Sequence, residues 1–132
     1  MSVASAQMGK GVAVKEDKMS ILLSFEDGSV GTVNYFGNGS KSYPKEMLEV
    51  FSEGRVLRLN NFRKLEGFGF RGFRKFRTPK MDKGHQGQFN AFVERVEKGG
   101  EPLISIDDIV NVTQASFAAV TSAAEGRVVM VG

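Results

Sequence analysis

The chain has 132 residues, of which 41% are hydrophobic and 25% charged, with a formal net charge of +3. This length suits one compact domain, and we expect residues 1–132 to fold around a single core. The sequence has no cysteine, which excludes disulfides, thiolate catalysis and cysteine-bound zinc. His85 is the only histidine, which argues against a metal site built from several histidines. No apolar run reaches the roughly 20 residues of a membrane span, so we expect a cytoplasmic protein.

Most of the first half of the sequence reads as strands and tight turns. Asp27-Gly28 is a typical hairpin turn, and the residues after it alternate with a period of two. Ser52-Glu53-Gly54 predicts a second hairpin. From Asn60 to Lys83 the apolar residues follow neither the period of two of a strand nor the period of 3.6 of a helix. We expect an extended excursion there with at most a short strand. The predicted strands are 3–8, 19–25, 29–36, 47–51, 55–59 and 127–131.

Two helices are predicted near the end of the chain. In 85–98 the residues Phe89, Phe92, Val93 and Val96 form one apolar stripe, which Gly99-Gly100 ends. The second helix begins at Ser105, with Asp108 in a capping position, and stops at Gly126. We expect its inward side chains to be Ile109, Val110, Thr113, Phe117 and Val120, while several alanines allow close packing on a sheet. Strands first and helices last predict an α+β domain: a mostly antiparallel open sheet with two C-terminal helices on one face.

Charge is concentrated in residues 62–83, which hold eight basic and two acidic side chains, a local balance of +6. Within it, 67–72 matches the glycine pattern G-x-G-x-x-G. A dinucleotide site needs that pattern to follow a strand and to open a helix. We expect neither here, and therefore no cofactor binding by this segment.

The same segment interleaves phenylalanines with basic residues. Aromatic stacking combined with phosphate neutralisation is one way to hold single-stranded nucleic acid. A small basic nucleic-acid-binding module that uses 62–83 is therefore the alternative function. The simpler interpretation is a loop or sheet edge that buries its phenylalanines and turns its charges to water, and we favour it. Nucleic acid and membranes are not the expected partners.

Several segments, in the same order, resemble the C-terminal domain of the glucose–fructose oxidoreductase/inositol dehydrogenase (Gfo/Idh/MocA) family. They are 25–32, 48–51 with Gly54, the helix with His85, Phe89 and Phe92, and Pro102 with Asp107-Asp108. Residues 35–46 and 59–63 resemble a bacterial bi-domain subgroup, in which this module ends a longer chain that also carries a zinc-alcohol-dehydrogenase-like part. Gln88 departs from the glutamate usual in the family helix.

The resemblance implies a substrate-side and oligomerisation domain of an NAD(P)-dependent oxidoreductase that acts on a sugar or cyclitol derivative. In the family, a Rossmann domain binds NAD or NADP, and a Glu-Lys-Pro segment supplies a catalytic lysine. Neither is found in this sequence, so we expect a domain fragment with no catalytic, cofactor-binding or metal-binding residues and no activity alone. The expected partners are the Rossmann domain of the parent chain and a second copy, as a homodimer through the sheet.

The glycine-rich polar loop 37–45 joins two predicted strands, a place where binding groups are often carried. By the resemblance, the matching loop approaches the cleft shared with the Rossmann domain. Asn38, Ser40, Lys41 and Tyr43 offer amide, ammonium and hydroxyl groups suited to a polyol, and Lys41 could meet a carboxylate or phosphate. His85, at a helix start, could complete this rim. The alternative is a mobile hairpin loop and a structural histidine.

Overall fold

A computed structural model describes residues 1–7 and 18–132, so Met8 of the first predicted strand lies outside the described residues. The described chain forms two four-stranded antiparallel sheets and two helices, which confirms the α+β class. The strands are β1 Ser2–Gln7, β2 Lys18–Ser24, β3 Val30–Phe36, β4 Met47–Ser52, β5 Arg55–Asn60, β6 Lys64–Phe68, β7 Lys75–Arg77 and β8 Val129–Met130. The helices are α1 His85–Lys98 and α2 Ile106–Glu125.

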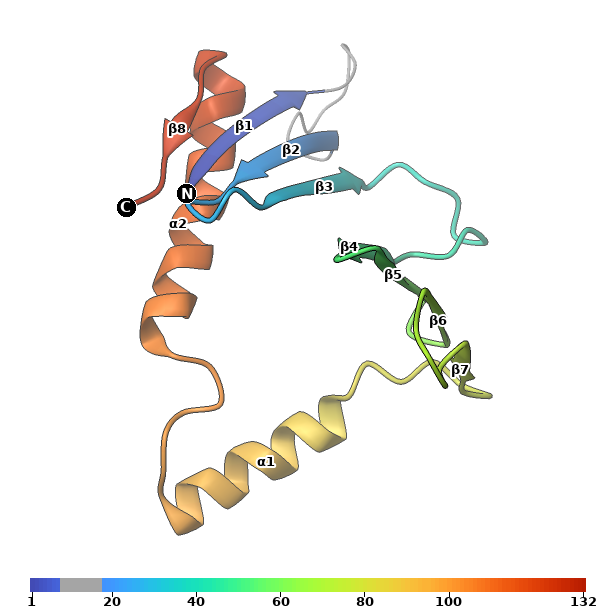
Figure 1. The fold of residues 1–132 in the computed structure, drawn as a ribbon. Helices are drawn as coiled ribbons and strands as arrows, with labels where there is room; N and C mark the ends of the chain where they lie inside the picture. Colours follow the sequence, from blue (N-terminus) through green and yellow to red (C-terminus); the bar gives the residue numbers. More distant parts are fainter. Residues whose placement is uncertain (8–17) are drawn as a thin grey trace. The chain divides into compact units, whose positions relative to one another are not determined.

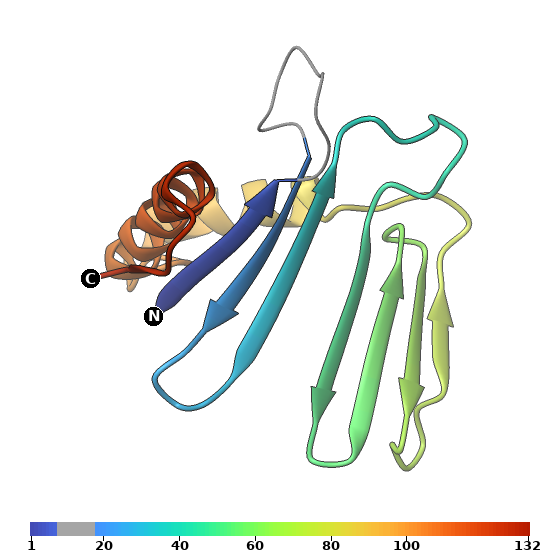
Figure 2. The same cartoon turned by 90° about the horizontal axis from the view of Figure 1, so that it is seen from above.

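The strands divide between two compact units instead of forming the single predicted sheet. The first unit comprises residues 1–39 and 100–132, and the second comprises residues 40–99. The sheet of the first unit has the order β3-β2-β1-β8, with α2 lying along β1 and β8 (Figure 1). The sheet of the second unit is the meander β4-β5-β6-β7 (Figure 2). Segment 60–83, expected as an extended excursion, contributes two strands, because residues 64–68 pair with β5 and residues 75–77 pair with β6.

Both predicted hairpins are confirmed, and side chains and positive φ angles explain their turns. In the first, Asp27 accepts a hydrogen bond from the Ser29 backbone N–H at 2.9 Å, which lowers the pKa of the Asp27 carboxyl. In the second, Glu53 and Gly54 have φ of 49° and 73°, the two consecutive left-handed residues of a type I′ turn. This turn twists the strands in the direction that the sheet requires.

The core of the first unit depends on small residues in α2. Ala118 and Ala119 are buried against Val3 of β1 and Met19 of β2. Their lack of bulk lets the helix backbone approach the sheet closely, and a stripe of neighbours shares that face: Ala115, Ser122 and Ala123.

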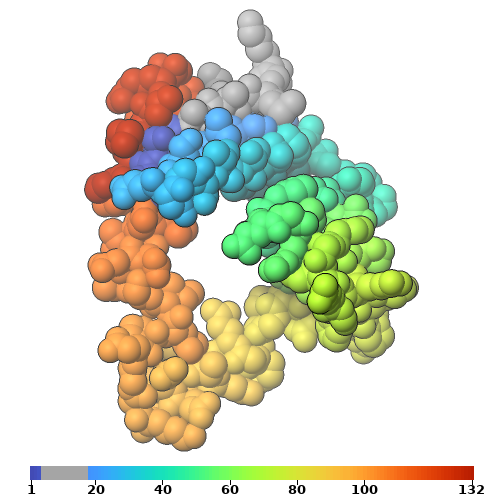
Figure 3. Space-filling model, in the orientation of Figure 1, coloured from blue at the N-terminus to red at the C-terminus, as the bar shows by residue number. Residues whose placement is uncertain are grey.

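The prediction of large inward residues in α2 was therefore wrong. Phe117 is 67% exposed, and Ile109, Val110, Thr113 and Val120 are exposed as well. They lie on other faces of the helix, because the alanine stripe faces the sheet. The N-terminal turns of α2, in orange, extend past the sheet and stand clear of it on the face drawn (Figures 1 and 3).

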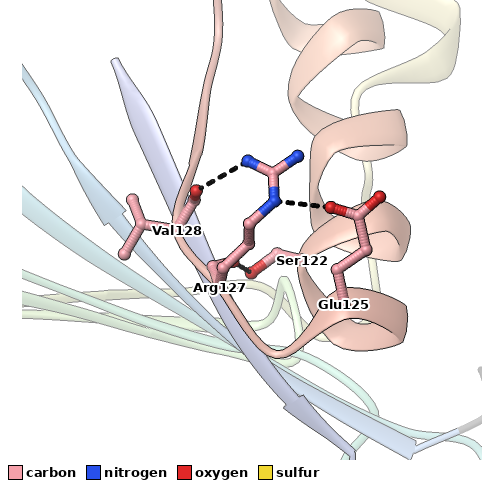
Figure 4. Close-up of polar contacts among 4 residues, drawn as sticks. All are labelled: Ser122, Glu125, Arg127 and Val128. Atoms are coloured by element: carbon pink, nitrogen blue, oxygen red, sulfur yellow. Dashed lines mark hydrogen bonds and ion pairs between the residues drawn. The ribbon is translucent and has the colours of Figure 1, made fainter.

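α2 is capped by a side chain at its start and by a glycine backbone at its end. At the start, the Ser105 hydroxyl accepts a hydrogen bond from the Asp108 N–H at 3.0 Å, as the sequence predicted. At the end, Gly126 takes a left-handed φ of 66°, and its N–H donates to the Ser122 carbonyl at 2.8 Å. The buried Ser122 hydroxyl donates to the Arg127 carbonyl, and Arg127 donates to Glu125 (Figure 4). These bonds direct the chain into β8, which pairs with β1.

The second sheet has two chemically different faces. Its register places Glu49, Arg58, Glu66 and Lys75 directly opposite one another across the four strands, on the face called the charged face below. Because side chains alternate along a strand, the neighbouring row lies on the other face. That face, called the apolar face below, carries Leu48, Val50, Leu57, Leu59, Leu65 and Phe76.

Helix α1 has the predicted bounds, but its apolar stripe is not buried. It begins after Gly84, ends before Gly99, and holds no buried residue. Phe89 is 62% exposed, and Phe92 and Val96 are exposed too. Among the described residues, neither helix has the length and apolar character needed to cross a membrane.

Replacing Ser105 by alanine should destabilise the first unit by about 1 kcal/mol, because the start of α2 loses a side-chain cap. The free energy of unfolding, from urea titration followed by circular dichroism, measures the loss. Ser116→Ala, within the exposed part of the same helix, is the matched control and should change stability much less. Equal effects of the two substitutions would contradict the capping role.

Candidate functional site

The predicted substrate loop is divided between the two units. Asn38 belongs to the first unit, whereas Ser40, Lys41, Tyr43 and His85 belong to the second. All five side chains are exposed. Ser40 organises a tight turn, in which its carbonyl accepts from the Tyr43 N–H at 3.0 Å and its hydroxyl lies 2.9 Å from that of Ser42. The loop therefore offers hydroxyl groups on a short, locally ordered turn.

The segments on either side of these residues are joined by an interaction cluster that the sequence did not predict. The carboxylate of Glu46, just after the loop, pairs with Lys83, two residues before His85. The Lys83 ammonium also lies 5.4 Å from the centre of the Phe62 ring. In addition, the Asn61 N–H donates to the Glu46 carbonyl at 2.7 Å. The end of the loop, the β5–β6 turn and the approach to α1 are thus held together within the second unit.

The β5–β6 turn has an unusual backbone. Asn61 and Phe62 have φ of 49° and 51°, and the Arg63 N–H donates to the Asn60 carbonyl at 3.0 Å. Asparagine tolerates this region, but a bulky aromatic residue rarely enters it. The contact of Phe62 with Lys83 and a hydrogen bond from the Asp82 N–H to the Phe62 carbonyl stabilise the strained turn. Backbone strain of this kind is often found at functional sites.

A cavity of about 350 Å³, called the basic pocket below, opens beside this turn. It is lined by Pro44, Asn60, Asn61, Arg63, Lys64 and Arg77. Lys64 and Arg77 are directly opposite in the register of β6 and β7, so their side chains share one face of the sheet. The lining thus combines three cationic side chains with two amides and no carboxylate. The sequence signalled only the local excess of basic residues.

An ion-pair network on the charged face adjoins the pocket. Glu66 lies 2.6 Å from the Lys64 ammonium and 2.9 Å from the Arg58 guanidinium. The hydrogen bonds from Lys64 and then from Arg58 lower the pKa of the Glu66 carboxyl. This network holds Lys64 at the edge of the pocket and fixes the pairing of β5 with β6.

The glycine pattern at 67–72 serves a hairpin. β6 runs into it, contrary to the expectation that no strand would precede the pattern, but the next element is β7 and not a helix. A Cβ atom on Gly67 would lie 2.5 Å from the Phe73 ring, and one on Gly69 would lie 2.8 Å from the Gly54 carbonyl oxygen. Gly69 and Gly72 also have positive φ. Close packing and turn geometry therefore account for these glycines.

The phenylalanines of the basic segment are distributed over different surfaces. Phe70 and Phe73 pack edge to face, with ring centres 6.4 Å apart. Phe68 lies on the charged face, with the Arg58 guanidinium 5.8 Å from its ring centre, whereas Phe76 lies on the apolar face. The two most exposed rings are therefore on opposite sides of the sheet and form no common stacking platform.

Neither a family model nor the sequence of a curated protein matches this chain. Among solved structures, an oxidoreductase from Agrobacterium radiobacter in complex with NAD+, L-tartaric acid and magnesium is similar, with 22% identity and a TM-score of 0.78. The match covers 97% of this chain and 42% of that one. Levoglucosan dehydrogenase in complex with NADH and levoglucosan has 21% identity and a TM-score of 0.76, over 98% of this chain and 44% of that one.

Levoglucosan dehydrogenase in complex with NADH and L-sorbose has 20% identity and a TM-score of 0.74, over 99% of this chain and 44% of that one. This chain thus spans less than half the length of the proteins that it resembles. At such identities the likeness establishes the fold, which the chain shares with part of these oxidoreductases.

Replacing Glu66 by glutamine should lower the urea midpoint of the protein at pH 7, because two cations lose their carboxylate. The folded pKa of Glu66 lies below its ordinary value of 4.5, so its stabilising contribution is complete above that value. The contribution is lost as pH falls through the lowered pKa. Wild type and Glu66→Gln should therefore differ at pH 7 and converge in more acidic solution.

Glu97→Gln, on the exposed surface of α1, is the matched control for this titration. It should leave the midpoint nearly unchanged at both pH values. A difference between wild type and Glu66→Gln that persists or grows in acid would contradict the assignment.

Proposed function

We propose that this chain is the substrate-side and assembly domain of an NAD(P)-dependent oxidoreductase that acts on a sugar or cyclitol derivative. The observation that carries the proposal is the fold. Nearly all of this chain matches part of three oxidoreductase structures solved with NAD+ or NADH, and the match covers 42–44% of the length of each of those chains. The ordered resemblance of its segments to the Gfo/Idh/MocA C-terminal domain supports the same assignment. In this proposal, a Rossmann domain of the parent chain supplies NAD or NADP and the catalytic lysine.

The exposed apolar side chains of the helices support a role inside a larger protein. Phe89 and Phe92 of α1 are exposed, as are Ile106, Val112 and Phe117 of α2. Large contiguous apolar patches are uncommon on monomeric soluble proteins and often mark interaction surfaces. We assign these helix surfaces to contacts with the rest of the enzyme.

The apolar face of the second sheet supports self-association. Phe76, Leu48 and Val50 are exposed there, while the opposite face carries the charged rows. In a dimer with its two-fold axis through this face, each copy would cover the same side chains of the other. Closed two-fold dimers are the commonest oligomers. The proposed dimer therefore forms between apolar faces.

The polar loop supplies the proposed substrate contacts. Asn38, Ser40 and Tyr43 carry amide and hydroxyl groups that can bond to the hydroxyls of a polyol. Lys41 is exposed and can meet a negative charge, and His85 begins α1 two residues after Lys83 of the Glu46–Lys83 pair. These residues bind and orient substrate in the proposal, while hydride transfer belongs to the cofactor domain.

In the full-length enzyme, Lys41→Ala or His85→Ala should raise KM or lower kcat several-fold, because a substrate contact is lost. Cofactor affinity should not change, because these residues do not contact the nicotinamide in the proposal. Steady-state kinetics with saturating NAD(P) and direct titration of the cofactor separate the two effects. Wild-type kinetics and stability in both variants would show that the loop assignment is wrong.

The dimer can be tested with two equivalent substitutions on opposite faces of the second sheet. Phe76→Lys places a charge on the apolar face and should give a monomer in light scattering. Phe51→Lys changes a still more exposed ring on the opposite face and should leave the dimer intact. A wild-type monomer at all concentrations, or dissociation by Phe51→Lys alone, would contradict the proposal.

A further inference from the structure

The basic pocket has the composition of a binding site for a small anion. Its lining carries Arg63, Lys64 and Arg77 and no carboxylate. Glu66, the acidic group beside it, is paired with both Lys64 and Arg58, so it does not cancel the charge of the two arginines. Arg63 uses one nitrogen to donate to the Pro79 carbonyl at 2.8 Å, which positions the guanidinium while leaving further N–H donors.

Arg77 is the cation of the pocket best placed to meet a ligand. It is exposed, and within residues 1–7 and 18–132 it makes no ion pair. Guanidinium groups recognise carboxylate and phosphate through two parallel hydrogen bonds. The pocket therefore offers a ready partner for either group.

Asn61 adds an amide group to the lining of the pocket. Its backbone N–H is bonded to Glu46, but no donor in the described part of the chain reaches its buried side-chain oxygen, Oδ1. Because Oδ1 is closed to solvent, the polar group that Asn61 can offer to a ligand is its amide nitrogen, a donor for a hydroxyl or an anionic oxygen. The left-handed backbone of Asn61 and Phe62 fixes this side chain at the pocket wall.

We propose that the basic pocket binds a small polyhydroxylated anion, a sugar that carries a carboxylate or a phosphate. The anionic group bonds to Arg77 and its cationic neighbours, and the Asn61 amide nitrogen donates to a sugar hydroxyl oxygen. This site goes beyond the proposed oxidoreductase function, because it needs neither a cofactor nor the proposed substrate contacts at Asn38, Ser40, Lys41 and Tyr43. A volume of about 350 Å³ accommodates a monosaccharide derivative.

Isothermal titration of the 132-residue chain with gluconate, glucose 6-phosphate, glucose and inorganic phosphate tests this site. At least one sugar anion should bind saturably. Glucose and inorganic phosphate should each bind at least about tenfold more weakly, because glucose lacks the charged contact and phosphate lacks the sugar hydroxyls. Binding of gluconate would indicate a carboxylate ligand, and binding of glucose 6-phosphate would indicate a phosphate ligand. Failure of both sugar anions to bind, or equal binding of glucose or inorganic phosphate, would overturn the proposal.

Two variants and a control locate the binding. Asn61→Asp keeps a residue that tolerates positive φ and places a negative charge in the pocket, so affinity should fall tenfold or more. Arg77→Gln should also weaken binding about tenfold, whereas Arg71→Gln removes the same charge outside the pocket and should have no effect. Thermal unfolding midpoints confirm that the variants fold. Wild-type affinity in both pocket variants would overturn the proposal, while the oxidoreductase assignment would stand independently.

Discussion

Four hydrophobic side chains are buried among the described residues, and all four lie where α2 packs on the first sheet. The contact depends on alanines, which bring the helix backbone close to β1 but bury little apolar area per residue. Large apolar side chains remain exposed on α1, on α2 and on the second sheet. Because burial of apolar surface is the main favourable term in folding, these surfaces are candidates for contacts with other protein. The proposed cofactor domain and second copy would provide them.

The second unit is organised differently, by hairpin register and charge pairing. Arg58, Glu66 and Lys64 connect β5 with β6, and Glu46 with Lys83 connects the two ends of the unit. Such pairs fix geometry more than they stabilise, since partly exposed ion pairs contribute little free energy. A unit of this kind holds polar groups in defined positions, as a binding domain requires.

Local signals in the sequence predicted the elements well. Asp27-Gly28 and Glu53-Gly54 marked the hairpins, and Ser105 with Asp108 marked the start of α2. The packing was harder to predict, because α2 has two candidate stripes, and periodicity alone favoured Phe117 over the alanines. Only the close approach of β1 and β8 decides between them. The division into two sheets likewise depends on pairing between strands, which alternation within one strand does not specify.

The candidate site was only partly predictable, because it too depends on contacts between residues that are far apart in the sequence. The loop residues stood out by composition, but the pairing of Glu46 with Lys83 joins positions that are 37 residues apart. The strained turn at Asn61 and Phe62 was also hidden, because Phe62 is not a residue that normally indicates positive φ. The sequence did show the excess of basic residues at 62–83, whereas the pocket arises from the register that places Lys64 opposite Arg77.

The central claim is that this chain is one domain of an oxidoreductase whose nicotinamide cofactor is bound by another domain. Titration with NADH tests it most directly, when this 132-residue chain is compared with the protein encoded by its complete reading frame. The account predicts no saturable fluorescence change with the chain alone, because its glycine pattern opens no helix. It predicts micromolar binding by the complete protein, together with a recognisable Rossmann domain in the same frame. Micromolar NADH binding by the 132-residue chain alone, or a complete protein without nicotinamide binding, would contradict the account.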